Sequence, residues 1–515
     1  MTLLSCTTCR KAAGYHLSLP TPPCPHLFHC NNSPTEEEAK LIHGVIDQVE
    51  HELDILTPEI KRLKRIVKDL ERARDALKSY SLQHKAMLLP IRRFPQELWE
   101  TIFTFCLPSQ TPEDLDFWDT TQAPWVLTHV CSRWRSIAMG YVRLWDNIII
   151  NAKPLKRSKK NRNDLLRTYL ERAGNHPIRV RLHLEYDRIE DRAILSRLVR
   201  HSHHWQSLEL KVPVALFKLM LPISGRLPVL QKLKIHVQHY RAEDISEMFS
   251  VAPMLRDARF VVVPFYDIYP SFPFHQLLRL AGTYNVELAL RVLSQTRRLE
   301  DCRLLVHDRG SHIPMPEAII SLNHLRVLAI DVEKDLRILD FIHLPCLESL
   351  RIEILERPTP ASEFRDGGLK VAPILRLLHR SSPPLSSLRI QDSFWTEKDF
   401  NTLLHTIPTV RELHVSLVQV LLSFSGLVDE ASDHVLLPNL EALSLEVHSQ
   451  MDTDGLLDFL ESRYRNGGNS SPVICLRQCR IRTAARFQPS VQTRVRLEKL
   501  KAEGMDVSIT DQRYS

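Results

Sequence analysis

Apolar residues between positions 37 and 89 recur at steps that alternate between four and three. They fall at Ile42, Ile46, Val49, Leu53, Leu56, Ile60, Leu63, Val67, Leu70 and Leu77, with Arg74 at the one seam position that is not apolar. A 3.5-residue period of this length is typical of a coiled coil. Pro58 interrupts the pattern, so the segment is expected either to form a kinked helix that needs a partner or to fold back as a hairpin. Because two facing Arg74 side chains repel, we favour a hairpin or an intramolecular contact.

A second pattern recurs between residues 176 and 515, where short strands of the form Leu-x-x-Leu-x-Ile follow turn residues. The first positions of these strands are Trp205, Leu230, Leu255, Leu299, Leu325, Leu347, Leu385, Val410 and Leu440. Successive positions are 25, 25, 44, 26, 22, 38, 25 and 30 residues apart, so the two long gaps hide a degenerate repeat or carry an insertion. Apolar spacing of three and four predicts helices at 242–250, 286–295, 396–406 and 454–464.

The predicted unit is therefore a strand, a helical crossover and a parallel strand. This period resembles that of leucine-rich repeats, which implies a curved solenoid with a parallel sheet on its concave side. The fourth position of the motif is expected to point inward at Leu233, Leu328, Leu350, Leu388, Leu413 and Leu443.

Residues 90–150 predict two short apolar helices, separated by a Pro-rich loop at 108–124 and followed by a strand. Leu98, Ile102, Phe103 and Phe105 supply more apolar surface than so small a unit buries by itself. Spare apolar surface on a small helical unit indicates a protein partner.

These residues resemble the F-box. Phe94-Pro95 stands at the family's opening Leu-Pro, 130–134 reads Val-Cys-Ser-Arg-Trp, and Leu144-Trp145 matches the closing Leu-Trp, although the insert at 108–124 departs from the family. The resemblance implies that an adaptor-binding surface is formed or supported by Phe94, Pro95, Leu98, Ile102, Phe103, Val130 and Trp134. The expected fold class is α/β: a helical coiled coil and a three-helix F-box, then an irregular leucine-rich-repeat solenoid with a parallel sheet.

The order of these parts resembles the F-box-like proteins of mushroom-forming fungi. That resemblance implies a non-catalytic substrate-receptor subunit of a Skp–cullin–F-box ubiquitin ligase, which binds a Skp-type adaptor, through it a cullin, and an unidentified protein target. A scaffolding protein that acts through its coiled coil and repeat surface without a ligase is the alternative. A hydrolase hidden in the repeat domain is a third possibility.

Strand residues between the buried leucines are expected to face the concave surface, because side chains alternate along a strand. Several of them are basic, and we predict target binding at Arg326, Arg351, Arg389 and Arg411. Arginine pairs bidentately with carboxylate and phosphate, so an acidic or phosphorylated target segment is expected. A solvated strand face without a ligand is the alternative.

Composition narrows the function further. Only 14 residues are Gly, and the chain has none of the Gly-rich motifs that cradle phosphates, so no catalytic residues, no cofactor and no metal are predicted. A net charge of +7, spread over 515 residues, is too dilute to indicate nucleic-acid binding. No apolar run is long enough to span a membrane and no secretory signal is present, so a cytoplasmic or nuclear location is expected. Buried free thiols are expected at Cys106, Cys131, Cys302 and Cys346.

The expected domains are a disordered lead-in at 1–36, the coiled coil at 37–89, the F-box-like domain at 90–150, a basic linker and helix at 151–175 and the repeat domain at 176–515. Within the lead-in, Cys6, Cys9, Cys24 and Cys30 are either incidental or a zinc set, since the first pair has the spacing of a metal knuckle. The basic run at 153–162 is either a solvated loop or a nuclear-import signal.

Overall fold

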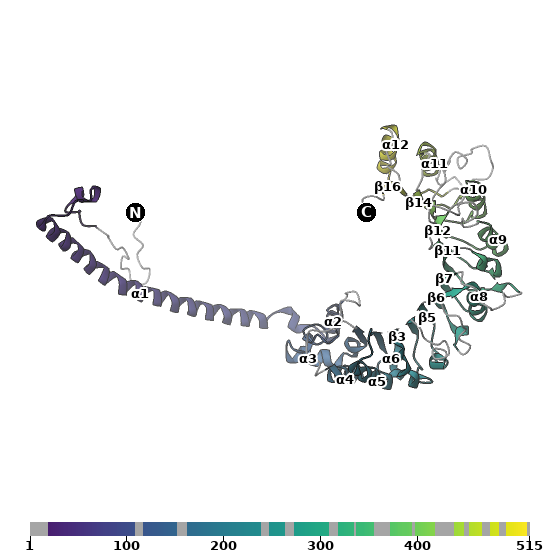
Figure 1. Ribbon diagram of the computed structural model, residues 1–515, viewed down its shortest axis with the longest axis horizontal. Helices are drawn as coiled ribbons and strands as arrows, with labels where there is room; N and C mark the ends of the chain where they lie inside the picture. The colour runs from purple at the N-terminus through teal and green to yellow at the C-terminus, as the bar shows by residue number, and fades with distance from the viewer. Residues whose placement is uncertain are drawn as a thin grey trace. The chain divides into compact units, whose positions relative to one another are not determined.

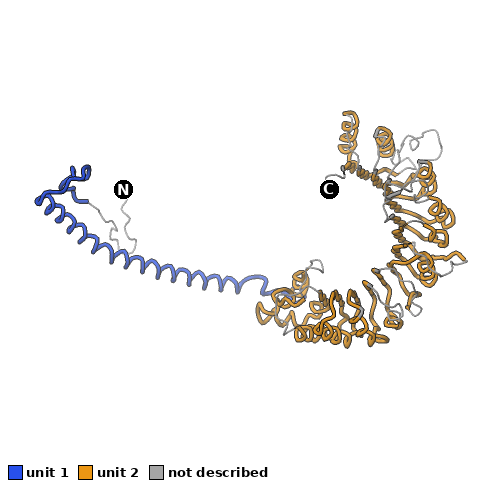
Figure 2. Tube along the Cα trace, viewed as in Figure 1, with its two compact units in different colours: residues 1–98 blue, residues 99–515 orange. Residues whose placement is uncertain are grey.

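The structure, a computed structural model, describes residues 19–108, 117–151, 162–237, 247–262, 272–307, 318–333, 336–354, 371–393, 397–417, 437–447, 453–465, 474–483 and 491–511. The chain divides into two compact units, residues 1–98 and residues 99–515 (Figure 2). None of the helices in the described ranges has the length and apolar character needed to cross a bilayer.

The first unit is dominated by one helix, α1 (Glu36–Met87), preceded by the 3-10 turn η1 (Pro25–His29) and followed by η2 (Pro90–Arg93). A capping box starts α1: the Thr35 main-chain N–H donates to Glu38 Oε2 (2.8 Å) and the Glu38 N–H donates to Thr35 Oγ1 (3.4 Å). The helix continues through Pro58, so the predicted hairpin is wrong. Next to the proline, the Thr57 hydroxyl donates to the Leu53 carbonyl at 2.8 Å and adds a bond where the chain has lost a main-chain donor.

Short helices follow α1. They are α2 (Gln96–Phe105), which contains the boundary between the two units, then η3 (Val126–Thr128), α3 (Ser132–Gly140) and η4 (Val142–Trp145). α3 begins at Cys131, whose Sγ accepts the Trp134 main-chain N–H at 3.4 Å. A sulfur in the N-cap position satisfies one of the otherwise unpaired donors of the first turn.

A 14-stranded parallel sheet forms the rest of the second unit (Figure 1). Its strands, in spatial order, are β1 (Asn147–Asn151), β2 (Ile178–His183), β3 (Trp205–Lys211), β4 (Lys232–Val237), β5 (Asp257–Val262), β6 (Arg279–Asn285), β7 (Asp301–His307), β9 (Val327–Val332), β11 (Ser349–Ile354), β12 (Ser387–Ser393), β13 (Glu412–Leu417), β14 (Ala442–Val447), β15 (Gln478–Thr483) and β16 (Asp506–Asp511). Short strands β8 (Ile320–Ser321) and β10 (Ile342–His343) pair with each other. Strand order therefore follows chain order, as in a solenoid.

Helices cover one side of this sheet and leave the other side to the strands (Figure 1). They are α4 (Arg162–Ala173), α5 (Ile189–Arg200), η6 (Ser202–His204), α6 (Val214–Lys218), η7 (Leu221–Ile223), η8 (Phe274–Gln276), α8 (Val286–Gln295), η9 (Arg337–Phe341), α9 (Ala372–Ser381), α10 (Glu397–Thr406), α11 (Thr453–Arg465) and α12 (Val491–Ala502). The helices predicted at 286–295, 396–406 and 454–464 are confirmed as α8, α10 and α11. Of the helix predicted at 242–250, residues 247–249 are helical and 242–246 lie outside the described residues.

The core lies between the strands and the helices. The six motif leucines predicted to point inward are all buried, with exposed fractions between 0% and 5%: Leu233, Leu328, Leu350, Leu388, Leu413 and Leu443. The 44-residue gap contains β6, so it hides a degenerate repeat. The 38-residue gap contains α9, and its residues 355–370 lie outside the described part.

The expectation of buried thiols holds for Cys302 and is wrong for the other three residues named with it. Cys106, Cys131 and Cys346 are exposed. Each lies at or beyond the end of an element, where the chain turns at the surface, whereas Cys302 points inward from β7. Cys6, Cys9 and most of the basic run at 153–162 lie outside the described residues.

Candidate protein-binding surfaces

Three aromatic rings join α2 to α3. The Trp134 ring lies 5.0 Å from both the Trp99 ring and the Phe103 ring, and the latter two are 5.8 Å apart, measured between centroids. Trp99 is 4% exposed and Phe103 is fully buried, so the cluster is the internal core of this small helical region. Tilted and edge-on rings at these distances attract one another beyond the area that they bury.

A second aromatic cluster ties the helical region to the first strands of the sheet. The Trp145 ring lies 5.1 Å from the rings of both Trp125 and Tyr169, and its Nε1 donates to the Ala138 carbonyl at 2.8 Å. The Arg172 guanidinium lies 4.4 Å from the Trp145 ring, a cation–π contact. The buried Tyr169 hydroxyl donates to the Leu144 carbonyl in η4 and the Asn147 carbonyl at the start of β1, and its burial raises the pKa of Tyr169. These contacts hold the helical region and the start of the sheet together.

The residues predicted for adaptor binding divide by burial. Leu98 is 48% exposed and Val130 is 55% exposed; Pro95 is also exposed. Phe94, Ile102 and Trp134 are partly buried, and Phe103 is buried. Phe103 therefore has only a supporting position, whereas the first three residues present surface to solvent.

Sequence reasoning left two surface residues out of this set. Phe105 ends α2 with 85% of its surface exposed, and Met139 in α3 is 45% exposed. Phe105 follows Leu98 by seven residues on the same helix, so both side chains lie on one face of α2. Helical periodicity alone places Phe105 on the same face of α2 as Leu98. The sequence did not show that this face points away from the Trp99, Phe103 and Trp134 rings.

The uncovered side of the sheet carries a row of basic residues. Hydrogen-bonded register aligns one position on each strand from β2 to β15, and seven of these positions are basic: Arg181, Lys234, Arg259, Arg303, Arg351, Arg389 and Arg480. We call these seven residues the basic row. Neighbouring strands are about 4.8 Å apart, so the row is a ladder of positive charge.

Acidic residues two positions away along the strands neutralise part of this ladder. Arg259 pairs with Asp257 at 3.1 Å, Arg303 lies 3.6 Å from Asp301, and Arg351 pairs with Glu353. The arginine side chains of these pairs are exposed, whereas the Asp257 carboxylate is buried and those of Asp301 and Glu353 are partly buried. The pairs therefore reduce the net positive charge of the basic row.

Of the four arginines predicted for target binding, Arg351 and Arg389 lie in the basic row, in direct register with each other. Arg326 and Arg411 lie one residue before their strands and pair with the neighbouring carboxylates of Glu348 and Glu441, each at 3.4 Å. The four predicted arginines therefore occupy two different places on the sheet, two within the basic row and two just before their strands.

Positive charge is concentrated around His414 on β13. Burial is the largest cause and the nearby charges of Arg389, Arg482 and Arg351 add to it, and together they lower the pKa of His414 to about 4. His414 aligns with Arg389 in the sheet register. Within the described ranges, Arg389 has no acidic partner. We call His414, Arg351, Arg389 and Arg482 the His414 cluster. Arg351 pairs with Glu353 and Arg482 is aligned with Glu446, so Arg389 is the member of this cluster whose charge is available to an anionic ligand.

A different cluster surrounds Glu209 on β3. His183 and His236 each place Nε2 3.3 Å from Glu209 Oε1, a set that has the residue types of a zinc site. However, Lys234 Nζ lies 2.9 Å from the same oxygen and Arg181 Nε lies 2.6 Å from the other. Burial opposes ionisation of Glu209, but these hydrogen bonds and charges outweigh it and lower the pKa of Glu209. A dication would have to displace a cation that already neutralises the carboxylate, so the cluster is better explained as an ion-pair network.

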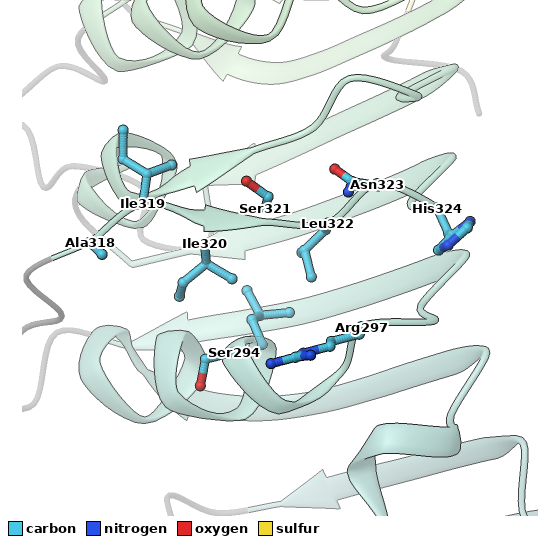
Figure 3. Close-up of a pocket in the computed structure, with 10 residues that line it drawn as sticks. Ser294, Arg297, Ala318, Ile319, Ile320, Ser321, Leu322, Asn323 and His324 are labelled. Carbon is cyan, nitrogen blue, oxygen red and sulfur yellow. The ribbon is translucent and has the colours of Figure 1, made fainter.

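A surface hollow of about 800 Å³ lies between α8 and the segment that contains β8. Figure 3 shows Ser294 and Arg297 on one wall and Ile320 on the facing wall. Its polar side chains among the described residues are Ser294, Ser321, Asn323, Arg297 and His324, and this described lining has no carboxylate or thiol. Residues 308–317, which precede Ala318 in the chain, lie outside the described residues.

No protein-family model matches this sequence, and a search of curated proteins found no match.

Proposed function

We propose that this chain is the substrate-receptor subunit of a Skp–cullin–F-box ubiquitin ligase. In this proposal, α2 and α3 bind a Skp-type adaptor, and the strand side of the sheet, taken as a leucine-rich-repeat surface, binds the protein target. The observation that carries the proposal is the combination of the F-box-like motifs with exposed apolar side chains on the helices that bear them. Such a subunit has no chemistry of its own, because it acts by holding a target near a charged ubiquitin carrier.

The adaptor half of the proposal is supported by the division of roles within α2 and α3. Trp99, Phe103 and Trp134 pack against one another and keep the helices in place. Leu98 and Phe105 remain exposed on one face of α2. Large apolar side chains at the surface of a small, rigid unit are typical of a protein interface.

The target half is supported by the charge of the basic row. Seven basic residues at aligned strand positions, with Arg389 lacking an acidic partner among the described residues, favour a target segment rich in carboxylates or phosphates. The arginines paired with Asp301 and Glu353 are themselves exposed, and such pairs are exchanged for ligand groups at little cost.

Copurification with a Skp-type adaptor tests the adaptor half. The double change Leu98→Ala with Ile102→Ala is expected to abolish recovery of the adaptor, because truncation of one interface anchor typically costs at least ~2 kcal/mol, about 30-fold in affinity. Ile189→Ala is the matched control, since Ile189 is an apolar residue that is 84% exposed on α5, away from the F-box-like residues. Recovery of the adaptor by the double variant at the level of the control would contradict the proposal.

Charge reversal tests the target half. Arg351→Glu with Arg389→Glu is expected to release targets captured by the native chain while adaptor recovery stays unchanged. Arg326→Glu with Arg411→Glu is the comparison, because these arginines lie outside the basic row. Captured targets that remain bound to the first variant, or binding that ignores ionic strength, would contradict the assignment of the target surface.

The alternative function is a scaffolding protein that never joins a ligase. The exposed apolar seam of α1 favours this alternative, since a long helix of this kind assembles proteins without an adaptor. The two functions differ in one measurement: a scaffold would copurify with its assembly partners and without a Skp-type adaptor or cullin.

A further inference from the structure

Helix α1 lacks the packing that normally stabilises a helix. It contains 52 residues, and none of them is buried. Most helices in proteins are stable because an amphipathic face packs on something else, and propensity alone contributes little. Six of the seam side chains from Leu53 to Leu77 are exposed by 47% to 70%. They are Leu53, Ile60, Leu63, Val67, Leu70 and Leu77. This seam has no partner among the described residues of its own unit, residues 1–98.

The seam has the composition of a two-stranded parallel coiled coil. In heptad notation, its d positions from the middle of the helix onward are all Leu: Leu56, Leu63, Leu70 and Leu77. The intervening a positions are Ile60, Val67 and Arg74. Branched Ile or Val at a with Leu at d favours two parallel strands over three or four.

Charges beside the seam are compatible with a second copy of the same helix. In a parallel pair, each g position faces the e position five residues later on the partner. Glu59 then faces Lys64, an attractive pair, and none of the six other g–e pairs from 38 to 85 brings like charges together. A sequence that is self-complementary at both seam and flanks fits its own copy.

Two features that argue against a dimer at first sight are explained by the structure. Pro58 occupies an f position, on the side of the helix away from the seam, and α1 continues through it. Arg74 lies 3.0 Å from Asp75, which reduces the net charge of this layer. A single polar residue at an a position costs stability but helps to fix the register, because a pairing shifted by one heptad places Arg74 of one helix opposite Val67 of the other.

We propose that α1 pairs with α1 of a second copy to form a parallel, in-register, two-stranded coiled coil. The inference is independent of the adaptor and target proposals. A dimer presents two helical regions and two sheets on one stem, and this doubles the valency toward a target with repeated binding segments.

Sedimentation equilibrium of the purified full-length chain tests the proposal. The native chain is expected to have twice the 59.7 kDa mass of one chain. Leu63→Glu with Leu70→Glu places charges in the seam and is expected to weaken the dimer at least ~100-fold. Ile55→Glu with Leu82→Glu is the matched control, because these residues lie off the seam. Their exposed fractions, 50% and 66%, resemble the 47% and 65% of Leu63 and Leu70.

Two further variants test the register and direction. Arg74→Leu is expected to tighten the dimer at least ~10-fold, because it replaces the one polar seam residue. Val67→Cys is expected to give, on mild oxidation, a peptide that joins the two substituted positions, since only the parallel in-register pair brings them together. A monomeric native chain at ~10 µM overturns the proposal. Equal weakening by both glutamate pairs, or an Arg74→Leu variant that weakens the dimer, also overturns it.

Discussion

The sheet core offers a sharp test of the solenoid register at Leu350. This side chain is 0% exposed on β11 and lies in register between Leu328 on β9 and Leu388 on β12, which are 1% and 0% exposed. Leu350→Ala removes three carbon atoms, a transfer loss of ~2.4 kcal/mol at ~0.8 kcal/mol each. The neighbouring strands are fixed by main-chain hydrogen bonds and cannot close the space, so a cavity penalty is added. We expect a total loss of ~3–4 kcal/mol.

Urea unfolding followed by far-ultraviolet circular dichroism measures this loss as a shift of the midpoint. Arg351→Ala is the control, because Arg351 is the next residue on the same strand and faces solvent. Its exposed pair with Glu353 is worth at most ~1 kcal/mol. If the two variants shift the midpoint equally, the assignment of inward and outward positions on β11 is incorrect.

Three other outcomes follow from particular contacts. Trp145→Phe removes the donor to the Ala138 carbonyl and is expected to cost ~1–3 kcal/mol, measured as a lower melting temperature; an unchanged value would contradict the role of this bond. Asn285→Ala removes the side-chain oxygen that accepts the Leu288 N–H at 2.8 Å and caps α8, with an expected loss of ~1 kcal/mol in the same assay. The folded chain holds the pKa of His414 at about 4, below the ordinary 6.5, so the unfolded chain takes up this proton first as pH falls. Stability present above about pH 6.5 should decline toward pH 4, and His414→Gln should flatten that part of the pH profile.

Strand periodicity predicted much of the second unit. The Leu-x-x-Leu-x-Ile motif located the strands from β3 to β14, apart from β6 and the short β8 and β10, because a branched or Leu side chain must point inward at alternate positions. β15 was missed because Cys479 stands where the motif has its second Leu, and β16 because its apolar positions are Val507 and Ile509. The last two strands therefore lack the second Leu of the motif.

Two properties of the helical segments could not be predicted from the sequence. Periodicity identified α1, but the sequence did not show whether the chain continues through Pro58, since a proline is compatible with both a kinked and a broken helix. In the F-box-like segment, periodicity marked Phe103 and Leu98 alike as apolar. Only the position of the Trp134 ring shows that the first is buried and the second exposed.

The sequence motif already contained the alignment of the basic residues, but the prediction did not use it. Arg326 and Arg411 stand at the second position of the motif and were grouped with Arg351 and Arg389, which stand at the fifth. The strand register aligns the fifth positions with one another and leaves the second positions before the strands. The acidic partners of the row, such as Asp257 and Glu353, become neighbours only in the folded sheet.

Because spatial order in the sheet follows chain order, each strand pairs only with the strands before and after it. An evolutionary consequence is that length can change without redesign. Duplication or loss of one strand–helix unit lengthens or shortens the strand surface by about 4.8 Å. Only the contacts between that unit and its two neighbours change. Mutations in the last strands are likewise separated from α2 and α3 by the intervening strands. The proposed target surface can therefore change by mutation while the segment with the F-box-like motifs stays under its own, separate selection.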